Sequence, residues 1–344
     1  MNAIDRPILA RAFGPCTDWQ VAVAIRARNE ERRIVGCLAA VANALGGRGG
    51  IVLNVNASDD ETAATAARWF EASGIAGVVI EDPFPPARCG VGLARRVATE
   101  MAIGCLAPDG VVMTTDGDTA VAPDWVTANL AELAHADLVC GKVLVDAEEF
   151  STLPPLVGER AVDESEYLRL TIALRAALDP LAHDPRPEHL SAGGASLAFR
   201  AGLYHAVGGF PDVTEREDRL FAEAAEAQGL RVRHSSLPRV VASCRLTGRT
   251  PGGMSGTLRT RIHDADPFCD ELLEPAEITE RRLRLRGTAR RRWRGTPRGF
   301  AEAWAATEAA DETLRCDRMR LSDLRREMPI LRAIVGSLLL ERAS

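Results

Sequence analysis

The stretch Val21-Ala22-Val23-Ala24-Ile25 decides the fold, because it is an unbroken apolar run that leads directly into a helical pattern over residues 30–44. A run without the alternation of a half-exposed strand predicts a strand that is buried on both faces. The same order of strand and helix then recurs along the chain. Strands are predicted at 51–55, 77–80 and 110–114, and helices at 60–72 and 92–103. This alternation predicts an α/β protein with a Rossmann-like, mostly parallel sheet flanked by helices.

The pattern becomes less regular after residue 118. Helices are predicted at 125–134, 159–178 and 217–228, and shorter strands at 137–145, 196–199 and 231–234. The last part of the chain is rich in arginine and mostly helical in pattern. We therefore expect an N-terminal extension at 1–17, one α/β domain at 18–265 and a helical C-terminal extension at 266–344.

The composition excludes several classes of protein. The 344 residues are 46% hydrophobic and 26% charged, as in an ordinary globular protein. The net charge is −6, and residues 1–270 alone hold 26 basic and 36 acidic side chains, which disfavours a general nucleic-acid binder. No apolar run approaches the ~20 residues that span a bilayer. The charged start of the chain does not resemble a signal peptide, so we expect a cytoplasmic protein. The eight cysteines are scattered without a C-x-x-C pair, which disfavours structural zinc.

Two carboxylates follow the strand predicted at 110–114. Asp116 and Asp118 flank Gly117. Successive strand side chains point to opposite faces, so these two acids converge on one cation only if the backbone turns, which glycine permits. Oxygen ligands of this kind suit Mg²⁺ or Mn²⁺ bound to a phosphate-containing substrate. A strand-end turn with two solvated acids is the alternative interpretation.

Further polar residues follow strand ends or begin helices. They are Glu30 after Asn29, Asn56, Ser58, Glu217 and Asp218. Each alone is explained by helix capping or by the helix dipole. Right-handed crossovers, however, bring the carboxyl ends of parallel strands to one edge, where open α/β sheets bind ligands. A binding site at that edge is therefore expected.

The segment Gly90–Arg96 opens the helix predicted at 92–103. Free N–H groups at a helix N-terminus bind anions, and Arg95 lies in the first turn. We expect these groups to hold a diphosphate. No G-x-G-x-x-G follows the first strand, which disfavours a nicotinamide-dependent dehydrogenase.

Taken together, these segments resemble the family 2 glycosyltransferases with the GT-A fold. The segments that match occur in the family's order, and they are Val21–Ile34, Asn54–Thr62, Gly90–Arg96, Thr115–Trp125, Gly193–Pro211 and Glu217–Val232. They span about residues 18–262. The resemblance implies a nucleotide-binding half at 18–120 and an acceptor-binding half at 121–265.

The resemblance also implies roles for individual residues. It places the nucleotide or donor sugar at Ala27, Glu30, Asn56, Ser58, Arg95, Asp116, Gly194, Ala195 and Arg249. It places a metal at Asp116 and Asp118, and the catalytic base at Asp218 with Glu217 beside it. Arg245 would close over the diphosphate together with Arg249. His234 and His263 are each a candidate late metal ligand, and a structural role is the alternative for both.

The function that the resemblance implies is transfer of a hexose from a nucleotide sugar, such as a UDP- or GDP-sugar, to an acceptor hydroxyl. Mg²⁺ or Mn²⁺ would assist, and the anomeric centre would be inverted. The acceptor is a saccharide, a lipid or a small molecule. Three alternatives remain: a retaining glycosyltransferase of the same fold, a nucleotidyltransferase on a similar sheet, and a non-catalytic nucleotide-sugar-binding module.

The C-terminal extension permits two further interpretations. Residues 281–298 contain nine arginines and no acid. Such a run is typical of a solvated face or a flexible arm, and contact with anionic lipid at the inner membrane face is the alternative. The apolar segment Met328–Leu340 is expected to pack on the core or on a partner subunit, which leaves a homodimer open.

Overall fold

The computed structural model describes residues 9–82, 90–248 and 253–343, with side chains described as far as residue 340. The strands are β1 (Leu9–Phe13), β2 (Trp19–Ala27), β3 (Gly49–Asn56), β4 (Gly77–Asp82), β5 (Leu106–Asp116), β6 (Thr119–Val121), β7 (Leu138–Val145), β8 (Leu197–Arg200) and β9 (Val232–Ala242). The helices are α1 (Ile34–Leu45), α2 (Thr62–Ser73), α3 (Val91–Gly104), α4 (Trp125–Glu132), α5 (Ala147–Ser151), α6 (Pro155–Leu178), α7 (Ala201–Val207), α8 (Glu217–Ala227), α9 (Met254–His263), α10 (Ala276–Arg292), α11 (Pro297–Ala310), η2 (Glu312–Leu314) and α12 (Leu321–Ala343).

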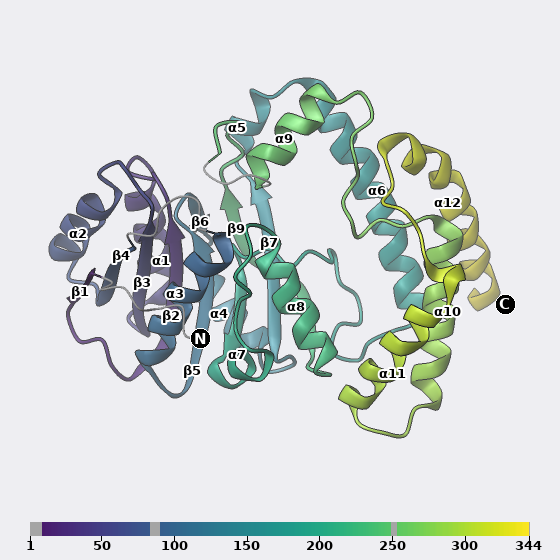
Figure 1. Cartoon of the computed structure of the whole chain (residues 1–344), viewed down its shortest axis with the longest axis horizontal. Helices are drawn as coiled ribbons and strands as arrows, with labels where there is room; N and C mark the ends of the chain where they lie inside the picture. The colour runs from purple at the N-terminus through teal and green to yellow at the C-terminus, as the bar shows by residue number, and fades with distance from the viewer. Residues whose placement is uncertain (1–8, 83–89, 249–252, 344) are drawn as a thin grey trace.

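All nine described strands form one sheet in the order β1-β4-β3-β2-β5-β8-β7-β9-β6. The strands β4, β3, β2, β5, β7 and β9 run in one direction, and β1, β8 and β6 run in the other. Helices flank the sheet (Figure 1). The predicted α/β fold with a mostly parallel sheet is therefore confirmed. The sequence patterns did not predict β1 or β6, and they predicted only the first residues of β9.

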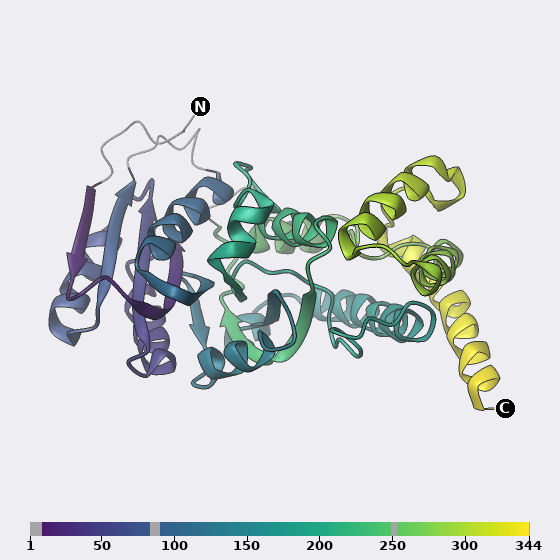
Figure 2. The ribbon, with the colours of Figure 1, turned by 90° about the horizontal axis from the view of Figure 1, so that it is seen from below.

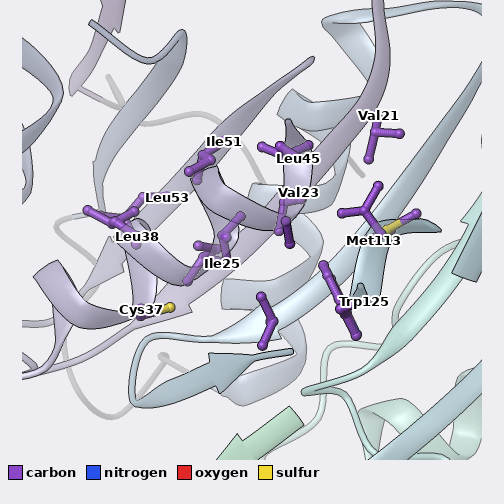
Figure 3. Packing of buried hydrophobic residues seen from close by; sticks show 14 of the residues in the cluster. Val21, Val23, Ile25, Cys37, Leu38, Leu45, Ile51, Leu53, Met113 and Trp125 are labelled. Carbon is purple, nitrogen blue, oxygen red and sulfur yellow. The ribbon is translucent and has the colours of Figure 1, made fainter. Parts of the chain in front are cut away.

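The apolar run Val21–Ile25 is buried on both faces, as predicted. Val21, Val23 and Ile25 belong to a core cluster that includes residues of α1, α2 and α4. Figure 3 shows them beside Leu38 and Leu45 of α1. The smaller Ala22 and Ala24 face a second cluster with α3, α7 and α8. This strand is therefore packed on both of its faces, which fixes the position of its carboxyl end.

The helix predicted at 30–44 begins later than expected. Asn29 has a φ of 54°, a left-handed conformation, and α1 starts at Ile34 with Arg33 as its N-cap residue. The prediction that Asn29 and Glu30 begin the helix is therefore wrong. The chain makes a turn after β2 instead, and this turn carries Glu30 to the sheet edge.

The C-terminal part is helical, as predicted, and it packs on α6. Tyr167 and Leu174 of α6 form a third apolar cluster with residues of α10 and α12 that include Leu283, Leu324 and Leu331. Both views show these helices gathered at the end of the molecule away from β1 (Figures 1 and 2).

The arginine run proves to be structured. It lies mainly in α10, where Arg286 and Arg290 both donate to the buried carboxylate of Asp179, and Arg282 pairs with Glu274. Of the two expected forms, the flexible arm is therefore wrong, whereas a solvated face agrees with the exposure of Arg281, Arg284 and residues 291–298. Within the described part of the chain, no helix is both long and apolar enough to cross a membrane.

Candidate active site

The candidate site lies at the carboxyl ends of β2, β3 and β5. Arg26 of β2 and Asp116 of β5 are register partners on neighbouring parallel strands. Arg26 Nη2 donates to Asp116 Oδ2 at 3.0 Å. The other carboxylate oxygen, Oδ1, accepts from Arg95 Nη2 at 3.1 Å. Burial opposes ionisation of Asp116, but these two guanidinium groups lower its pKa below the ordinary value.

Arg95 connects three parts of the site from beneath. Its side chain is only 2% exposed. Besides Asp116, Arg95 donates through Nε to Glu217 Oε1 at 3.0 Å and through Nη1 to the carbonyl oxygen of Gly194 at 2.6 Å. One buried guanidinium thus fixes the end of β5, the start of α8 and the loop that precedes β8.

Gly194 occupies a position that admits no side chain. A Cβ atom there would lie 2.2 Å from Arg95 Nη2, closer than real Cβ contacts allow. Both backbone groups of Gly194 are also engaged. Its oxygen accepts from Thr114 Oγ1 at 2.7 Å, and its N–H donates to Asp218 Oδ2 at 2.7 Å. Gly194 therefore connects Arg95 to Asp218 through hydrogen bonds at its backbone oxygen and N–H.

Asp218 is a half-buried carboxylate held by two backbone donors. The second is the N–H of Arg219, which donates to Oδ1 at 2.8 Å. Burial raises the pKa of Asp218, and the neighbouring Glu217 raises it further, against the effects of Arg95 and the two backbone hydrogen bonds. A carboxylate that is oriented and more basic than usual is suited to accept a proton.

Asp118 and Glu30 share one cation, Arg245, which follows β9. Arg245 Nη1 donates to Glu30 Oε2 at 2.8 Å, and its Nη2 contacts Glu30 Oε1 and lies 3.4 Å from Asp118 Oδ2. Burial raises the pKa of Asp118 to about 6, and the negative charges of Asp116 and Glu30 contribute to this shift.

The donor chemistry at this edge fits a divalent cation at Asp118. Carboxylate oxygens are the ligands that Mg²⁺ and Mn²⁺ prefer. Burial and the negative charges of Asp116 and Glu30 together raise the pKa of Asp118, and a cation would offset those charges. Asp116 is less available, because each of its oxygens already accepts from an arginine. Within the described ranges, no three His, Cys, Asp or Glu residues are grouped so that they could hold a metal ion.

Several predicted site residues lie deeper than expected. Glu217 is 3% exposed and faces Arg95, and Ala195 is 6% exposed within the apolar core. Arg95, predicted at a donor diphosphate, lies beneath Asp116 instead. Gly194 is also buried, and its backbone oxygen and N–H are both hydrogen-bonded. These four residues are buried and support the site; they do not line an open surface.

The N-terminus of α3, the predicted anion site, packs against another segment of the chain. Gly92 N donates to the oxygen of Val213 at 3.1 Å, and a Cβ atom at Gly92 would lie 1.9 Å from the oxygen of Pro211. The segment 211–214 thus covers this helix end. The N–H of Gly92 is therefore not free for an anion, and binding of a diphosphate at this helix end stays a prediction.

The residues predicted near the nucleoside lie together. Ser58 Oγ accepts from the N–H of Asn29 at 2.9 Å, which ties the loop after β3 to the turn after β2. Asn56 ends β3 and is 7% exposed. Ala27 ends β2, and Gly117 packs closely against it. Arg249 lies outside the described residues.

Sequence reasoning missed Arg26, although a single charged residue that interrupts an apolar strand is a usable signal. It also missed Cys37, whose thiol donates to the oxygen of Asp116 at 3.3 Å. His234, a candidate metal ligand, is instead paired through Nδ1 with Asp184 Oδ2 at 3.0 Å.

Comparison with known proteins gives structural matches only. No family model matches the chain, and no curated protein does. A mannosyltransferase from Pyrobaculum calidifontis, solved with GDP-Man and Mn²⁺, is 17% identical with a TM-score of 0.48, over 98% of this chain and 85% of that one. S. aureus TarS, solved with UDP, is 15% identical with a TM-score of 0.46, over 65% of this chain and 60% of that one. Glucosyl-3-phosphoglycerate synthase from Mycobacterium tuberculosis, solved with Mn²⁺, UDP and phosphoglyceric acid, is 19% identical with a TM-score of 0.42, over 73% and 83%.

This chain thus spans about 60% of the TarS structure solved with UDP. The three structures are of proteins that resemble this chain. Because their TM-scores are below 0.5, the activity has to be argued from this chain's own residues.

Proposed function

We propose that the chain is a family 2 glycosyltransferase of the GT-A type, which transfers a hexose from a nucleoside-diphosphate sugar to an acceptor hydroxyl. One observation carries most of the proposal. Buried Arg95 contacts both Asp116, at the expected donor end, and Glu217, which precedes the expected base Asp218. A network of this kind links a carboxylate at the expected donor end to the residue that precedes the expected proton acceptor.

The donor would lie along the ends of β2, β3 and β5. Ala27, Glu30, Asn56 and Ser58 would surround the nucleoside, within the half at 18–120. The half at 121–265 would hold the acceptor. A divalent cation held by Asp118 would neutralise charge that develops on the departing diphosphate.

The chain's own groups would carry the proton transfer. Asp218 would take the proton of the acceptor hydroxyl as the new bond forms, a contribution of about 10²–10⁴-fold. Gly194 and Arg219 keep its two oxygens oriented through their backbone N–H groups. Attack from the face opposite the diphosphate inverts the anomeric centre. Arg95 and Glu217 would act as positioning residues.

The alternatives predict different results. A nucleotidyltransferase would consume a nucleoside triphosphate, release pyrophosphate and have no need of Asp218. A retaining enzyme would give a product with the donor's anomeric configuration. A non-catalytic module would bind the donor without turnover.

The test begins with a thermal-shift panel of UDP-sugars, GDP-sugars and nucleoside triphosphates, each with Mn²⁺ or Mg²⁺. We expect one nucleotide sugar to stabilise the chain, and NMR of the product to show inversion. Asp218→Asn should bind that donor normally and lose transfer at least about 100-fold. Stabilisation by triphosphates alone, with pyrophosphate release, would contradict the proposal, and retained transfer by Asp218→Asn would remove Asp218 from the role of base.

A further inference from the structure

Arg245 bridges two carboxylates that lie far from it in the sequence. Glu30 follows β2 and Asp118 follows β5, whereas Arg245 follows β9. The Arg245 side chain is 14% exposed, and its partners are 6% and 23% exposed. The contact is therefore a largely buried group of one arginine and two carboxylates, each of which follows a different strand.

The charges in this group do not balance. Asp116 contacts two arginines, Arg26 and Arg95, and Arg95 is shared with Glu217. Arg245 is the cation that contacts both Glu30 and Asp118, so one guanidinium faces two carboxylates. A divalent cation carries the charge that this pair of acids needs. Arg245 Nη2, however, lies 3.4 Å from Asp118 Oδ2, so the guanidinium already contacts the carboxylate that such a cation would bind.

The surroundings allow the side chain of Arg245 to move while its backbone stays. Glu149 Oε2 accepts from the N–H of Cys244 at 2.8 Å and so anchors the residue before it. A pocket of 370 Å³ lies against Arg245, lined in part by Arg33 and Leu246. This pocket, which Asp118 does not line, offers the Arg245 side chain space away from that carboxylate; movement into it also breaks the hydrogen bond from Arg245 Nε to the oxygen of Thr247 at 3.1 Å.

We infer that Arg245 is an exchangeable cation. It occupies Asp118 when no ligand is bound, competes with a divalent cation for that carboxylate, and turns toward the donor's diphosphate once the cation has bound. The first half of this inference needs only the contacts above, and the second half rests on the proposed function. Its consequence is that removal of Arg245 strengthens cation binding and weakens nucleotide binding.

The test is Mn²⁺ binding to the full chain without nucleotide, measured by electron paramagnetic resonance. Arg245→Gln should bind Mn²⁺ about tenfold more tightly than the unchanged chain, a factor that equals 1.4 kcal/mol. Arg245→Lys keeps the charge and should bind as weakly as the unchanged chain. Arg282→Gln is the matched control, because Arg282 is 16% exposed and also bridges two carboxylates, Glu274 and Glu308, away from the site. It should leave Mn²⁺ affinity unchanged.

Two further measurements separate exchange from a structural role. Addition of Asp118→Asn to Arg245→Gln should abolish the gain in Mn²⁺ affinity. With saturating Mn²⁺, Arg245→Gln should bind UDP or GDP more weakly, whereas a general loss of structure would weaken both ligands. An unchanged or reduced Mn²⁺ affinity in Arg245→Gln, or a gain that survives Asp118→Asn, overturns the inference. If neither UDP nor GDP binds the unchanged chain, the proposed function fails, and the Mn²⁺ comparison still decides whether Arg245 competes for Asp118.

Discussion

Substitution of Gly194 tests whether Arg95 organises the site. In Gly194→Ala, the new Cβ atom would lie 2.2 Å from Arg95 Nη2 and 2.3 Å from its Cζ. Arg95 cannot retreat easily, because it is 2% exposed and fixed by Asp116 and Glu217. Overpacking of this kind costs about 1–3 kcal/mol, and the loss of a partner in a buried ion pair costs about 3–5 kcal/mol. We therefore expect Gly194→Ala to lower the free energy of unfolding by about 2–5 kcal/mol.

The assay is urea unfolding followed by tryptophan fluorescence, together with donor turnover. Gly36→Ala is the control, since Gly36 lies in α1 where a Cβ atom would meet no neighbouring atom within 4 Å, and helix propensity predicts a gain of up to about 1 kcal/mol there. Arg95→Met removes the group that the new Cβ atom meets, so the double variant Arg95→Met/Gly194→Ala should lose less stability than the two single changes added together. If Gly194→Ala is as stable and as active as the unchanged chain, the argument for Arg95 as an organising residue is refuted.

Three other predictions follow from the described contacts. Asp118→Ala should lose the Mn²⁺-dependent part of UDP or GDP affinity, as measured by calorimetry, and an unchanged Mn²⁺ dependence would remove Asp118 as the cation ligand. Burial opposes ionisation of Asp179, but hydrogen bonds from Arg290 and Arg286 hold its pKa in the folded protein below 3.8. The ionised carboxylate therefore stabilises the fold above pH 3.8, and this stabilisation is lost as the pH falls through the pKa of the folded protein. The difference in unfolding free energy between the unchanged chain and Asp179→Asn should accordingly shrink at pH values below 3.8. Several arginines of α10 are paired with acids, so we expect the chain to bind anionic vesicles only weakly. This binding should disappear at 0.15 M salt, where the Debye length is about 8 Å. Tight co-sedimentation with vesicles at that salt concentration would contradict the prediction.

The parts of the fold that the sequence predicts are those with strong periodicity. The run at Val21–Ile25 shows the buried strand, and the small residues Ala22 and Ala24 match the face that α3 covers. β1 and β6 are short and pair only at edges, so their sequence carries no such pattern. The extent of β9 was missed because a proline and two serines interrupt its apolar residues.

The site could be predicted as a list of residues, but their roles depended on long-range contacts. The partners of Arg95 lie 21, 99 and 122 residues away in the sequence. A local pattern therefore cannot tell a buried arginine that binds carboxylates from an exposed one that binds a diphosphate. The same limit applies to the start of α3, which is covered by a segment more than a hundred residues downstream. The alternation of strands and helices predicts that these residues gather at one edge of the sheet, and packing decides which of them reach its surface.

The continuous helix α6 has a consequence for how the chain can be shortened. Its apolar face, with Tyr167 and Leu174, is covered by α10 and α12, and Asp179 just beyond its end receives two arginines from α10. A protein cut near residue 270 would expose this face to water and leave a buried carboxylate without its counter-charges. We expect such a fragment to aggregate. Studies of lipid binding or acceptor choice should therefore alter the exposed arginines of α10 one at a time and keep the helix in place.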